Sequence, residues 1–569
     1  MKFIKVLLIF CYLIISQLTI FSQTAPSKYW VQFKDKNNST YSVSNPLEFL
    51  SQRAIDRRKA MNISITEQDF PVNKSYLDSI SDAGGVVLTT SRWHNGATFY
   101  TNDTNIAKRI LAMSFVVQVQ KTASIKKNRI PINTNSNFSV FKEINKTLSS
   151  NKEQLDFINK ERENPISSYN YGAAYQQNNM INVDYLHQLG YSGKGMLIAV
   201  LDAGFRKVDV LPAFDSLWAN NQIVGYKDFV NPNDIFFDQS THGMMVLSII
   251  SGQIPGSLVG TAPKASYLLL RSEDSGSELM IEEDNWVAAI EYADSCGADV
   301  VNSSLGYTKF DDSLQVRTYA DMTGKKSRAS QAATFAIHKG IIVCNSAGNS
   351  AEQTWHYIGA PADANGILTV GAVNYLRNYA TFSSVGPSAD GRVKPDIAAM
   401  GEATFVQNES GSVISGNGTS FSCPVITGAV ACLWQAFPNC SNFDIMDAIR
   451  KSADKYYNPD TLTGYGIPDF KLAYEFLMHK NFKLEPNIST FPNPFNSELN
   501  IIIDCDYRTD GHIFIYDIKG KLIFNTSIND LQIGNNKITI NNTDVLNNGI
   551  YILKIVTNKN VFSSKIIKS

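Results

Sequence analysis

The sequence carries almost no net charge, which removes the usual electrostatic reason to expect a nucleic-acid or anionic-membrane partner. Its 51 lysines and arginines nearly balance 52 aspartates and glutamates, so the formal net charge is -1. Proteins that bind phosphate backbones carry an excess of basic residues. Glycine (35 residues) and proline (19) are too few for a collagen-like or low-complexity chain. With 44% hydrophobic residues, the 569-residue chain can bury several cores.

Long apolar runs are absent except at the N-terminus. There, two lysines within the first five residues precede an apolar stretch at 6–21 that ends at the small residue Ser22. This pattern predicts a secretory signal peptide at residues 1–22. A membrane anchor is the weaker alternative, because polar residues interrupt the stretch and it barely reaches spanning length. We therefore expect an exported protein.

Cysteines are few, and their spacing fits no zinc pattern. Removal of the predicted signal peptide takes one of the seven, Cys11, away. An even number in an exported protein permits disulfides, but several lie in apolar runs where a buried free thiol is the alternative. The remaining cysteines are Cys296, Cys344, Cys423, Cys432, Cys440 and Cys505.

Several enzyme signatures are also missing. No GxSxG occurs, so the chain lacks the nucleophile elbow of lipases and esterases. No HExxH or clustered His/Asp/Glu pattern indicates a catalytic metal, and no loop resembles a calcium-binding EF-hand. We therefore expect no catalytic metal and a reaction that requires no cofactor; a structural calcium ion stays possible, although no ligands for it can be identified.

Composition and periodicity divide the rest of the chain into four segments. Residues 26–121 mix strand-like and helical patterns, which predicts a small α+β domain. Residues 122–174 are polar and poor in aromatics, typical of an exposed linker that proteases cut. Residues 175–480 alternate apolar runs with helical patterns, and residues 487–569 show short strands between Asn/Gly turns. The predicted fold class is α/β, with a doubly wound, mainly parallel sheet followed by a small all-β sandwich.

Within the large segment, four apolar runs bounded by glycine are predicted strands. An apolar stripe at helical period also predicts a helix that begins near Ser420 and is buried on at least one side. The four predicted strands are 196–201, 298–301, 340–344 and 366–373.

Two polar residues stand where a functional site is expected, since ligands bind at the carboxyl ends of parallel strands. Asp202 ends an apolar run, where backbone donors can hold its carboxylate; it can equally be a turn residue. His242 is the one histidine of seven that lies between a polar stretch and the start of a predicted helix. It is a candidate general base, or a packing residue.

A serine and an asparagine add a candidate nucleophile and a candidate oxyanion donor. Ser420 follows a glycine-rich approach, and a helix begins beneath its hydroxyl, so free N–H groups and the helix dipole would stabilise an oxyanion there. It can also be a simple N-cap. Asn349 ends a tight loop and can donate its side-chain N–H to the same oxyanion, or act as a turn residue.

The conjunction of these residues is more informative than any one of them. They occur in one domain in the chain order Asp, His, Ser, which is that of subtilisin. Five ordered motifs together resemble the subtilisin-like serine peptidases, also called subtilases or the S8 family. These motifs are IAVLDAG at 198–204, HG at 242–243, NSSLG at 302–306, AGN at 347–349 and GTSFSCP at 418–424, and GRVKPDI at 391–397 resembles a further segment.

The resemblance implies catalytic roles for the matched residues. Ser420 would be the nucleophile, His242 the general base and then the acid, and Asp202 the group that orients His242. Asn349 and the backbone N–H of Ser420 would form the oxyanion hole. An Asp-His-Ser triad of this kind hydrolyses peptide bonds through an acyl-enzyme.

Substrate-binding residues follow from the same resemblance. Ser304, Leu305 and Gly306 would form the edge strand that pairs with the substrate backbone and walls the S1 pocket. Gly359 would lie at the floor of that pocket, and a glycine there suggests a roomy, apolar pocket.

The chain departs from the family pattern at three places close to these residues. Ala203 replaces the usual Thr or Ser, Met244 the usual Thr, and Phe421-Ser422 the usual Met-Ala. None of these changes removes a catalytic atom, so we expect activity, whereas the shape of the pocket and the pH optimum do not follow from the family pattern.

The resemblance also suggests roles for the two segments that flank the predicted catalytic domain. Residues 26–121 resemble its propeptide, which would act as an intramolecular inhibitor until the linker is cut. Residues 487–569 resemble the type A C-terminal sorting domain of the Bacteroidetes type IX secretion system, with an adhesive or carbohydrate-binding sandwich as the alternative. The partners implied are protein substrates, the chain's own propeptide and the secretion machinery, and no nucleic acid.

The sequence therefore predicts a secreted serine endopeptidase, made as a zymogen and exported through the periplasm to the outside or the outer cell surface. Calcium is a common structural ion in the family, but no ligand pattern identifies a site here. A catalytically silent, subtilase-like binding module is the main alternative, and retention of all four catalytic positions argues against it. The missing elbow disfavours a lipase or esterase. The preferred P1 residue and the physiological substrates remain open.

Overall fold

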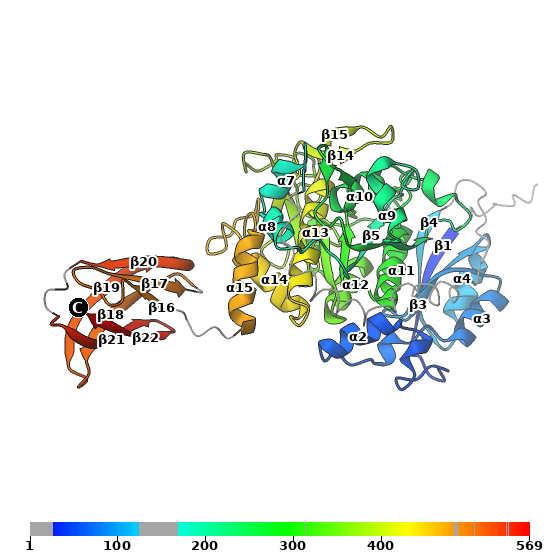
Figure 1. The fold of residues 1–569 in the computed structure, drawn as a ribbon. Coiled ribbons are helices and arrows are strands. Elements are labelled where there is room, and N and C mark those ends of the chain that lie inside the picture. Colours follow the sequence, from blue (N-terminus) through cyan, green and yellow to red (C-terminus); the bar gives the residue numbers. More distant parts are fainter. Residues whose placement is uncertain are drawn as a thin grey trace, which may run out of the picture. The chain divides into compact units, whose positions relative to one another are not determined.

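The computed structural model contains two units, residues 1–473 and 474–569 (Figure 1). The predicted signal peptide and most of the predicted linker lie outside the described residues. Within the described part of the chain, no helix combines the length and apolarity needed to cross a membrane. The residues that the structure describes are 27–124, 169–312, 315–482, 488–505, 507–541, 543 and 546–569.

The first unit begins with a small α+β domain. Its antiparallel sheet has the strand order β2-β3-β1-β4, and three helices accompany it. Ile80 of α3 and Ile110 of α4 are fully buried against Val31 and Phe99 of the sheet, which makes one apolar core. The elements are β1 (Ser27–Phe33), α2 (Gln52–Ala60), α3 (Lys74–Asp82), β2 (Val86–Ser91), β3 (Gly96–Thr101), α4 (Thr104–Leu111) and β4 (Val116–Ser124).

The large domain is built on a seven-stranded parallel sheet with the order β13-β12-β11-β10-β5-β9-β6. Except for the half-buried edge strand β6, the strands are buried and mainly apolar, as expected when helices cover both faces of a sheet. They are β5 (Leu197–Asp202), β6 (Ile223–Asp228), β9 (Ser266–Arg271), β10 (Val300–Ser303), β11 (Ile342–Ser346), β12 (Leu368–Val373) and β13 (Ile397–Met400).

The order of these strands creates a switch point between β5 and β10. From β5 the chain moves to one edge of the sheet through β6 and β9, and from β10 it moves to the other edge through β11, β12 and β13. The loops after β5 and β10 therefore leave in opposite directions, and the carboxyl ends of these two strands are where sheets of this kind usually bind their ligands. Asp202 ends β5, and Ser304 follows β10.

Four long helices cover the sheet (Figure 1). Helices α10 (His242–Ser251) and α13 (Thr419–Ala436) pack together on one face, and α11 (Ile281–Cys296) and α12 (Arg328–His338) pack together on the other. Every residue of α13 from Thr419 to Trp434 is buried. The apolar stripe in the sequence predicted burial of one face of this helix, and in the structure the helix is buried on all sides.

The small α+β domain packs on α11, so this helix is buried along its whole length, including its acidic residues. Asp294 of α11 accepts hydrogen bonds from the guanidinium groups of Arg57, Arg58 and Arg92, all from the small domain. Burial opposes the charge on Asp294, but these arginines hold its pKa below its usual value. An unpaired buried carboxylate is costly, so the two domains depend on each other for this charge balance.

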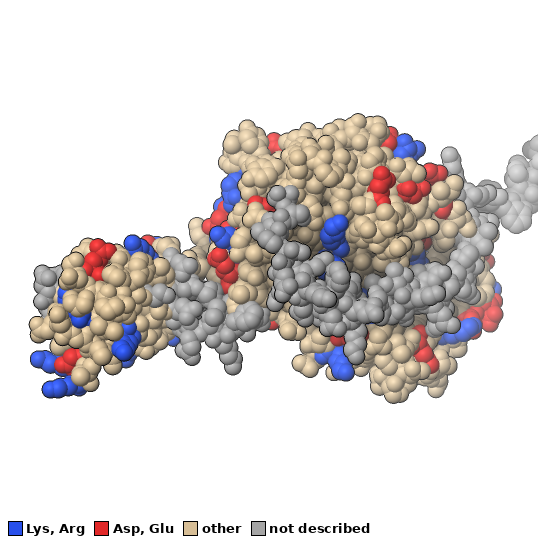
Figure 2. Space-filling view, viewed as in Figure 1, with Lys and Arg blue, Asp and Glu red and all other residues tan. Residues whose placement is uncertain are grey.

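Charged side chains of both signs are scattered over the face seen in Figure 2, and most of that surface is uncharged.

Further elements complete the first unit. The remaining α-helices and strands are α7 (Tyr175–Asn179), α8 (Val183–Gln188), α9 (Asp215–Ala219), β7 (Gln253–Ile254), β8 (Leu258–Val259), β14 (Thr404–Gln407), β15 (Val413–Gly416), α14 (Asn442–Lys451) and α15 (Phe470–Phe482), the last of which extends into the second unit. Short 3-10 turns are η1 (Pro46–Glu48), η2 (Glu67–Asp69), η3 (Pro212–Phe214), η4 (Phe236–Asp238) and η5 (Tyr319–Asp321).

The second unit is an antiparallel β-sandwich. Its two sheets have the orders β16-β17-β20 and β19-β18-β21-β22, and alternate residues of β17 (Leu499, Ile501 and Ile503) are fully buried between them. The α/β class with a terminal all-β region is thereby confirmed. The strands are β16 (Ile488–Phe491), β17 (Leu499–Cys505), β18 (Thr509–Asp517), β19 (Leu522–Leu531), β20 (Gly534–Ile540), β21 (Gly549–Thr557) and β22 (Val561–Lys568).

The six cysteines in the described part of the chain are all buried, and none of them forms a disulfide. Burial raises the pKa of the Cys296 and Cys344 thiols to about 12, so they pack as small apolar groups. Of the two alternatives that the sequence left open, the structure has the buried thiols.

Candidate active site

An aspartate and a histidine meet at the switch point of the sheet. Nδ1 of His242, the first residue of α10, lies 2.7 Å from Oδ1 of Asp202. The N–H of Ala203 donates to the same oxygen at 2.8 Å, and Asp202 is fully buried. A carboxylate oxygen can only accept here, so the proton lies on Nδ1 and leaves Nε2 of His242 as a free base.

Glycine at position 243 lets α10 approach β5 this closely. A Cβ placed on Gly243 would lie 2.4 Å from the carbonyl oxygen of Gly204 and 2.8 Å from the Cβ of Asp202. Both distances are too short for real carbon atoms. The HG motif therefore has a packing reason: any larger residue after the histidine would push the helix away from the carboxylate.

The aspartate also sets the charge of the histidine. Burial would lower the pKa of His242, but the negative charge of Asp202 and its hydrogen bond outweigh burial and raise that pKa above its usual value of 6.5. Glu273 contributes further in the same direction. The other carboxylate oxygen of Asp202 is buried and has no hydrogen-bond partner among the described residues, and Ala203 offers it no hydroxyl.

Ser420 lies on the first turn of α13, beside the histidine. Ser420 is 9% exposed. The ring of the next residue, Phe421, stacks near that of His242, with the two ring centroids 6.3 Å apart. The Ser420 hydroxyl donates to the carbonyl oxygen of Ser304 at 3.3 Å. Among the described residues it makes no hydrogen bond to His242. Catalytic hydrogen bonds often tighten only when substrate binds.

A proline inside α13 explains why Ser304 and Ser420 are joined. Pro424 has no N–H, so it cannot donate to the carbonyl oxygen four residues back, that of Ser420. The hydroxyl of Ser304 supplies the missing donor at 3.0 Å. The loop after β10 is thereby fixed to the helix that carries the candidate nucleophile.

Replacing Ser304 by alanine is expected to destabilise the protein by about 1–3 kcal/mol, because it leaves the buried Ser420 carbonyl without a donor. The free energy of unfolding in urea measures the loss. The matched double variant, S304A with P424A, restores an N–H at position 424 and should recover most of it. An S304A protein as stable as the wild type, or a loss that P424A does not reduce, would contradict this account.

The Asn349 side chain is held by one end only. Its Oδ1 accepts from the N–H of Thr419 at 2.8 Å and from the Thr419 hydroxyl at 3.0 Å. Its Nδ2 and the N–H of Ser420 both lie near the position that a Cβ on Gly418 would take, at 3.6 and 3.7 Å. Neither donor has an acceptor among the described residues. Two free N–H groups thus converge on one small space that glycine leaves open.

The predicted substrate-binding residues lie on two neighbouring segments. Ser304, Leu305 and Gly306 follow β10 without belonging to it, and the Leu305 carbonyl accepts from Asn345 Nδ2 at 3.2 Å. Gly359 precedes Ala360, whose backbone pairs with that of Tyr307, the residue after Gly306. A Cβ on Gly359 would meet the Thr308 methyl at 2.6 Å. That Gly359 lies at the floor of the S1 pocket stays a prediction.

Sequence reasoning missed three contributors to this site. Thr419 anchors Asn349, the ring of Phe421 faces His242, and Pro424 forces Ser304 to satisfy the Ser420 carbonyl. Only the last had a signal in the sequence, since a proline four residues into a helix always leaves one carbonyl free. In the part of the chain that is described, no three His, Cys, Asp or Glu side chains are grouped to hold a metal ion.

Comparison with known families matches three separate parts of the chain. Residues 193–467 match the model of the subtilase family, residues 28–137 that of the peptidase S8 propeptide domain of Bacteroidota, and residues 489–569 that of the secretion system C-terminal sorting domain.

Individual relatives are similar over the large domain. Subtilisin DY of Bacillus licheniformis is 27% identical over 287 residues, which cover 49% of this chain and 92% of the relative. Subtilisin NAT of Bacillus subtilis subsp. natto is 28% identical over 297 residues, or 52% and 69% of the two chains. Among solved structures, the MycP3 protease of a type VII (ESX-3) secretion system is 20% identical with a TM-score of 0.42, covering 53% of this chain and 88% of that one.

Proposed function

We propose that this chain, which belongs to the subtilase family of serine endopeptidases and carries a propeptide domain and a secretion sorting domain, cleaves proteins through an acyl-enzyme formed on Ser420. The observation that carries the proposal is the 2.7 Å contact between buried Asp202 and His242, next to the N-terminus of the helix that holds Ser420. The sorting domain marks the protein for type IX export to the cell surface or beyond.

In the first step, Oγ of Ser420 attacks the carbonyl carbon of the scissile peptide bond. His242 Nε2 takes the proton that the hydroxyl loses, since its Nδ1 already carries one. Asp202 stabilises the resulting imidazolium and keeps the ring in this orientation. To begin, the hydroxyl turns from the Ser304 carbonyl toward Nε2, and the long 3.3 Å bond that it gives up is weak.

The attack places negative charge on the former carbonyl oxygen. The space beside Gly418 suits this oxyanion, because Asn349 Nδ2 and the Ser420 N–H both border it. The positive end of the α13 dipole favours the same charge.

His242 then protonates the leaving amine, and a water molecule deprotonated by His242 hydrolyses the acyl-enzyme. We propose that Ser304, Leu305 and Gly306 pair with the substrate backbone beside this space. Every group in the scheme belongs to the chain, so catalysis needs no cofactor.

A fluorophosphonate probe tests the proposal. We expect it to label Ser420 of the matured protein, because the probe reacts only with an activated serine hydroxyl, and a chelator should leave the labelling unchanged. The variant H242A should lose the label, while H338A, which removes a histidine from the far end of α12, should keep it. Equal labelling of H242A and the wild type would overturn the role of His242. No label in the matured wild type would indicate a silent, binding-only domain.

Replacing Asn349 by alanine is expected to lower kcat by about 10²–10³-fold, the loss known for the corresponding donor in subtilisin. KM should change little, because the oxyanion exists only in the transition state. Steady-state kinetics on a peptide substrate separates the two constants. The variant T419V, which removes only one of the two donors that anchor Asn349, should lose far less. A change confined to KM would speak against an oxyanion role.

We also propose that the small α+β domain inhibits the enzyme until the linker is cut. It is fixed to α11 through Asp294 and the three arginines, and its last strand, β4, lies beside residues of the large domain: Gln315 donates to the carbonyl oxygen of Lys121 at 3.0 Å. Separation of the two domains would leave these buried charges without partners, which is costly, so the contact favours continued association. The sorting domain would be the part recognised by the secretion machinery.

A further inference from the structure

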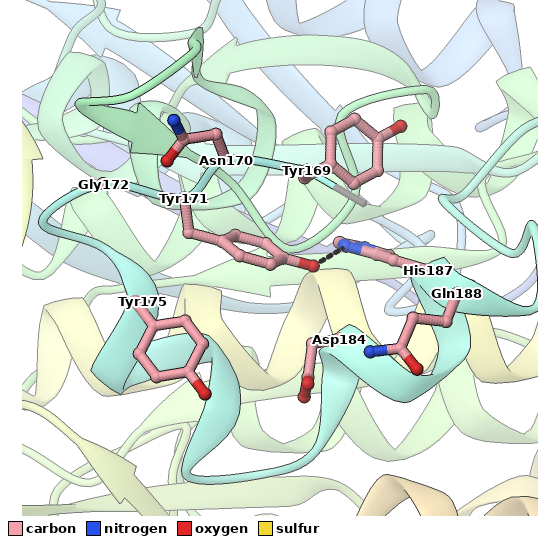
Figure 3. Close-up of a pocket in the computed structure, with 8 residues that line it drawn as sticks. All are labelled: Tyr169, Asn170, Tyr171, Gly172, Tyr175, Asp184, His187 and Gln188. Carbon is pink, nitrogen blue, oxygen red and sulfur yellow. Dashed lines mark hydrogen bonds between the residues drawn. The ribbon is translucent and has the colours of Figure 1, made fainter. Parts of the chain in front are cut away.

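A cavity of about 450 Å³ lies beside α7 and α8, away from the site described above (Figure 3). His187, which lines it, and Cys432 of α13 share one acceptor, the carbonyl oxygen of Thr261. With a rise of about 1.5 Å per helical residue, Cys432 lies about 18 Å along α13 from Ser420. The cavity is therefore outside the proposed active site, and its size is within the usual range for small-ligand sites.

Three tyrosine rings form much of the cavity wall. The Tyr171 ring is inclined by 55° to those of both Tyr169 and Tyr175, with centroids 6.2 and 6.4 Å away. Rings set at such angles do not cover one another's faces. Tyr171 is 6% exposed and Tyr175 is 52% exposed, so the wall runs from the interior to an open edge. Aromatic faces are electron-rich and attract cations.

The histidine of the cavity is neutral and has no free nitrogen. Burial lowers the pKa of His187 to about 4. Its Nε2 lies 2.9 Å from the Thr261 carbonyl, which can only accept, so Nε2 carries the proton. Nδ1 must then accept the hydrogen bond from the Tyr171 hydroxyl at 2.6 Å, the bond drawn in Figure 3. This leaves the lone pairs of the Tyr171 oxygen as acceptors.

Asp184 is the charged member of the described cavity lining. In Figure 3 its carboxylate lies on the same side of the Tyr171 ring as the side chains of Tyr175 and Gln188. Its Oδ1 is buried and has no hydrogen-bond partner within the described residues, and Oδ2 accepts only a long bond of 3.4 Å from Asn179. Burial, and next the charge of Asp184, raise the pKa of Tyr171 far above its usual value, so Tyr171 keeps its proton.

These features favour one class of ligand over others. An anion would meet the Asp184 carboxylate and no positive charge among the described lining residues, since His187 is neutral. A calcium ion could use the amide oxygens of Asn170 and Gln188 as well, but the described lining supplies only the single negative charge of Asp184, which balances a monovalent cation better than a divalent one. A neutral apolar molecule would cover the Asp184 carboxylate and offer no partner to its Oδ1, which is already buried without one.

We propose that this cavity binds an alkylammonium group, the cation of a lysine side chain or of a quaternary amine. The carboxylate of Asp184 pairs with the positive charge, and the Tyr171 and Tyr175 rings, on the same side of the cavity (Figure 3), contact the alkyl part and the charge. A primary ammonium can also donate to the Tyr171 oxygen. This inference does not depend on the catalytic role of Ser420.

Ligand-observed NMR with the full-length chain tests the proposal, with S420A as background so that the chain stays uncut. The probes are choline and Nα-acetyl-lysine methylamide, and 3,3-dimethylbutan-1-ol is a neutral molecule with the shape of choline. We expect both ammonium probes to bind and the neutral alcohol to bind at least about tenfold more weakly. Tighter binding of the lysine derivative would identify a peptide side chain as the ligand, and tighter binding of choline a quaternary amine.

Two pairs of variants make the test specific. D184N should weaken both ammonium probes at least about tenfold and leave the neutral alcohol unchanged, while D209N, at an exposed aspartate elsewhere, should have no effect. Y175L should weaken them about fivefold, while Y175F keeps the ring and the affinity. Because Tyr175 is half exposed, both of its variants should fold. Equal binding of choline and the alcohol, no saturable binding of either ammonium probe, or unchanged binding in D184N would overturn the proposal.

Discussion

Replacing Ser420 by alanine is expected to lower kcat for peptide hydrolysis by about 10⁶-fold, the magnitude known for the serine of this triad in subtilisin. The variant keeps the histidine base and the oxyanion donors, but it has no oxygen to attack the substrate. The matched control is S422A, two residues further along α13, whose hydroxyl donates to the Thr419 carbonyl at 3.1 Å. It should retain activity within a few-fold. Active-site titration with steady-state kinetics separates true loss from inactive protein.

The same variant tests self-processing. In a purified system the S420A chain should stay full-length, because the variant lacks the hydroxyl that we propose cuts the linker. Mass spectrometry of the chain over time measures this. Accumulation of the processed form in purified S420A would show that another protease performs the maturation, while leaving the role of Ser420 in peptide hydrolysis intact. Residual activity close to that of the wild type would instead contradict the nucleophile.

Replacing Asp202 by asparagine should lower kcat by about 10⁴-fold, the loss known for this change in the trypsin triad. The amide can donate an N–H to Nδ1 of His242, which favours the tautomer with its proton on Nε2, where the base is needed. The protein should still fold, since asparagine has nearly the same shape. The control is D209N, which removes an exposed aspartate from the loop after β5.

The pH profile of D202N gives an independent readout. Asp202 raises the pKa of His242, and the enzyme works only when this histidine is neutral, so wild-type activity rises with pH through that elevated pKa. Removing the negative charge lowers the pKa, so the acid limb of kcat/KM for the residual activity should move to lower pH. An unchanged acid limb would mean that another group controls it.

Much of the fold followed from local patterns. The runs predicted at 196–201, 298–301, 340–344 and 366–373 overlap β5, β10, β11 and β12, because a strand buried on both faces is apolar throughout. Strands β6, β9 and β13 were missed. Strand β6, which carries Lys227 and Asp228, is at the edge of the sheet, and β13 is only four residues long, so neither has a strong pattern.

Helix α11 was not predicted from the sequence, for a different reason. Its sequence is rich in acidic residues, which normally mark a solvent-exposed face, yet all sixteen of its residues are buried. Three of its carboxylates, those of Asp284, Glu291 and Asp294, have hydrogen-bond partners on the small domain; Asp294, for example, accepts from Arg58, more than two hundred residues earlier in the chain. A pattern confined to one helix contains no information about such partners.

The sequence by itself carried the resemblance to the subtilases and to the propeptide and sorting domains, and it predicted four catalytic side chains, since each stands in a short motif whose chemistry is local. Only the tertiary structure decided how they meet. Asp202 and His242 are 40 residues apart, and Ser304 and Ser420 are 116 apart. Whether Gly359 leaves open space, whether the cysteines pair and whether Asp184 borders a cavity depend on which distant atoms pack nearby. Close packing joins residues that are remote in sequence, so no local pattern can specify these contacts.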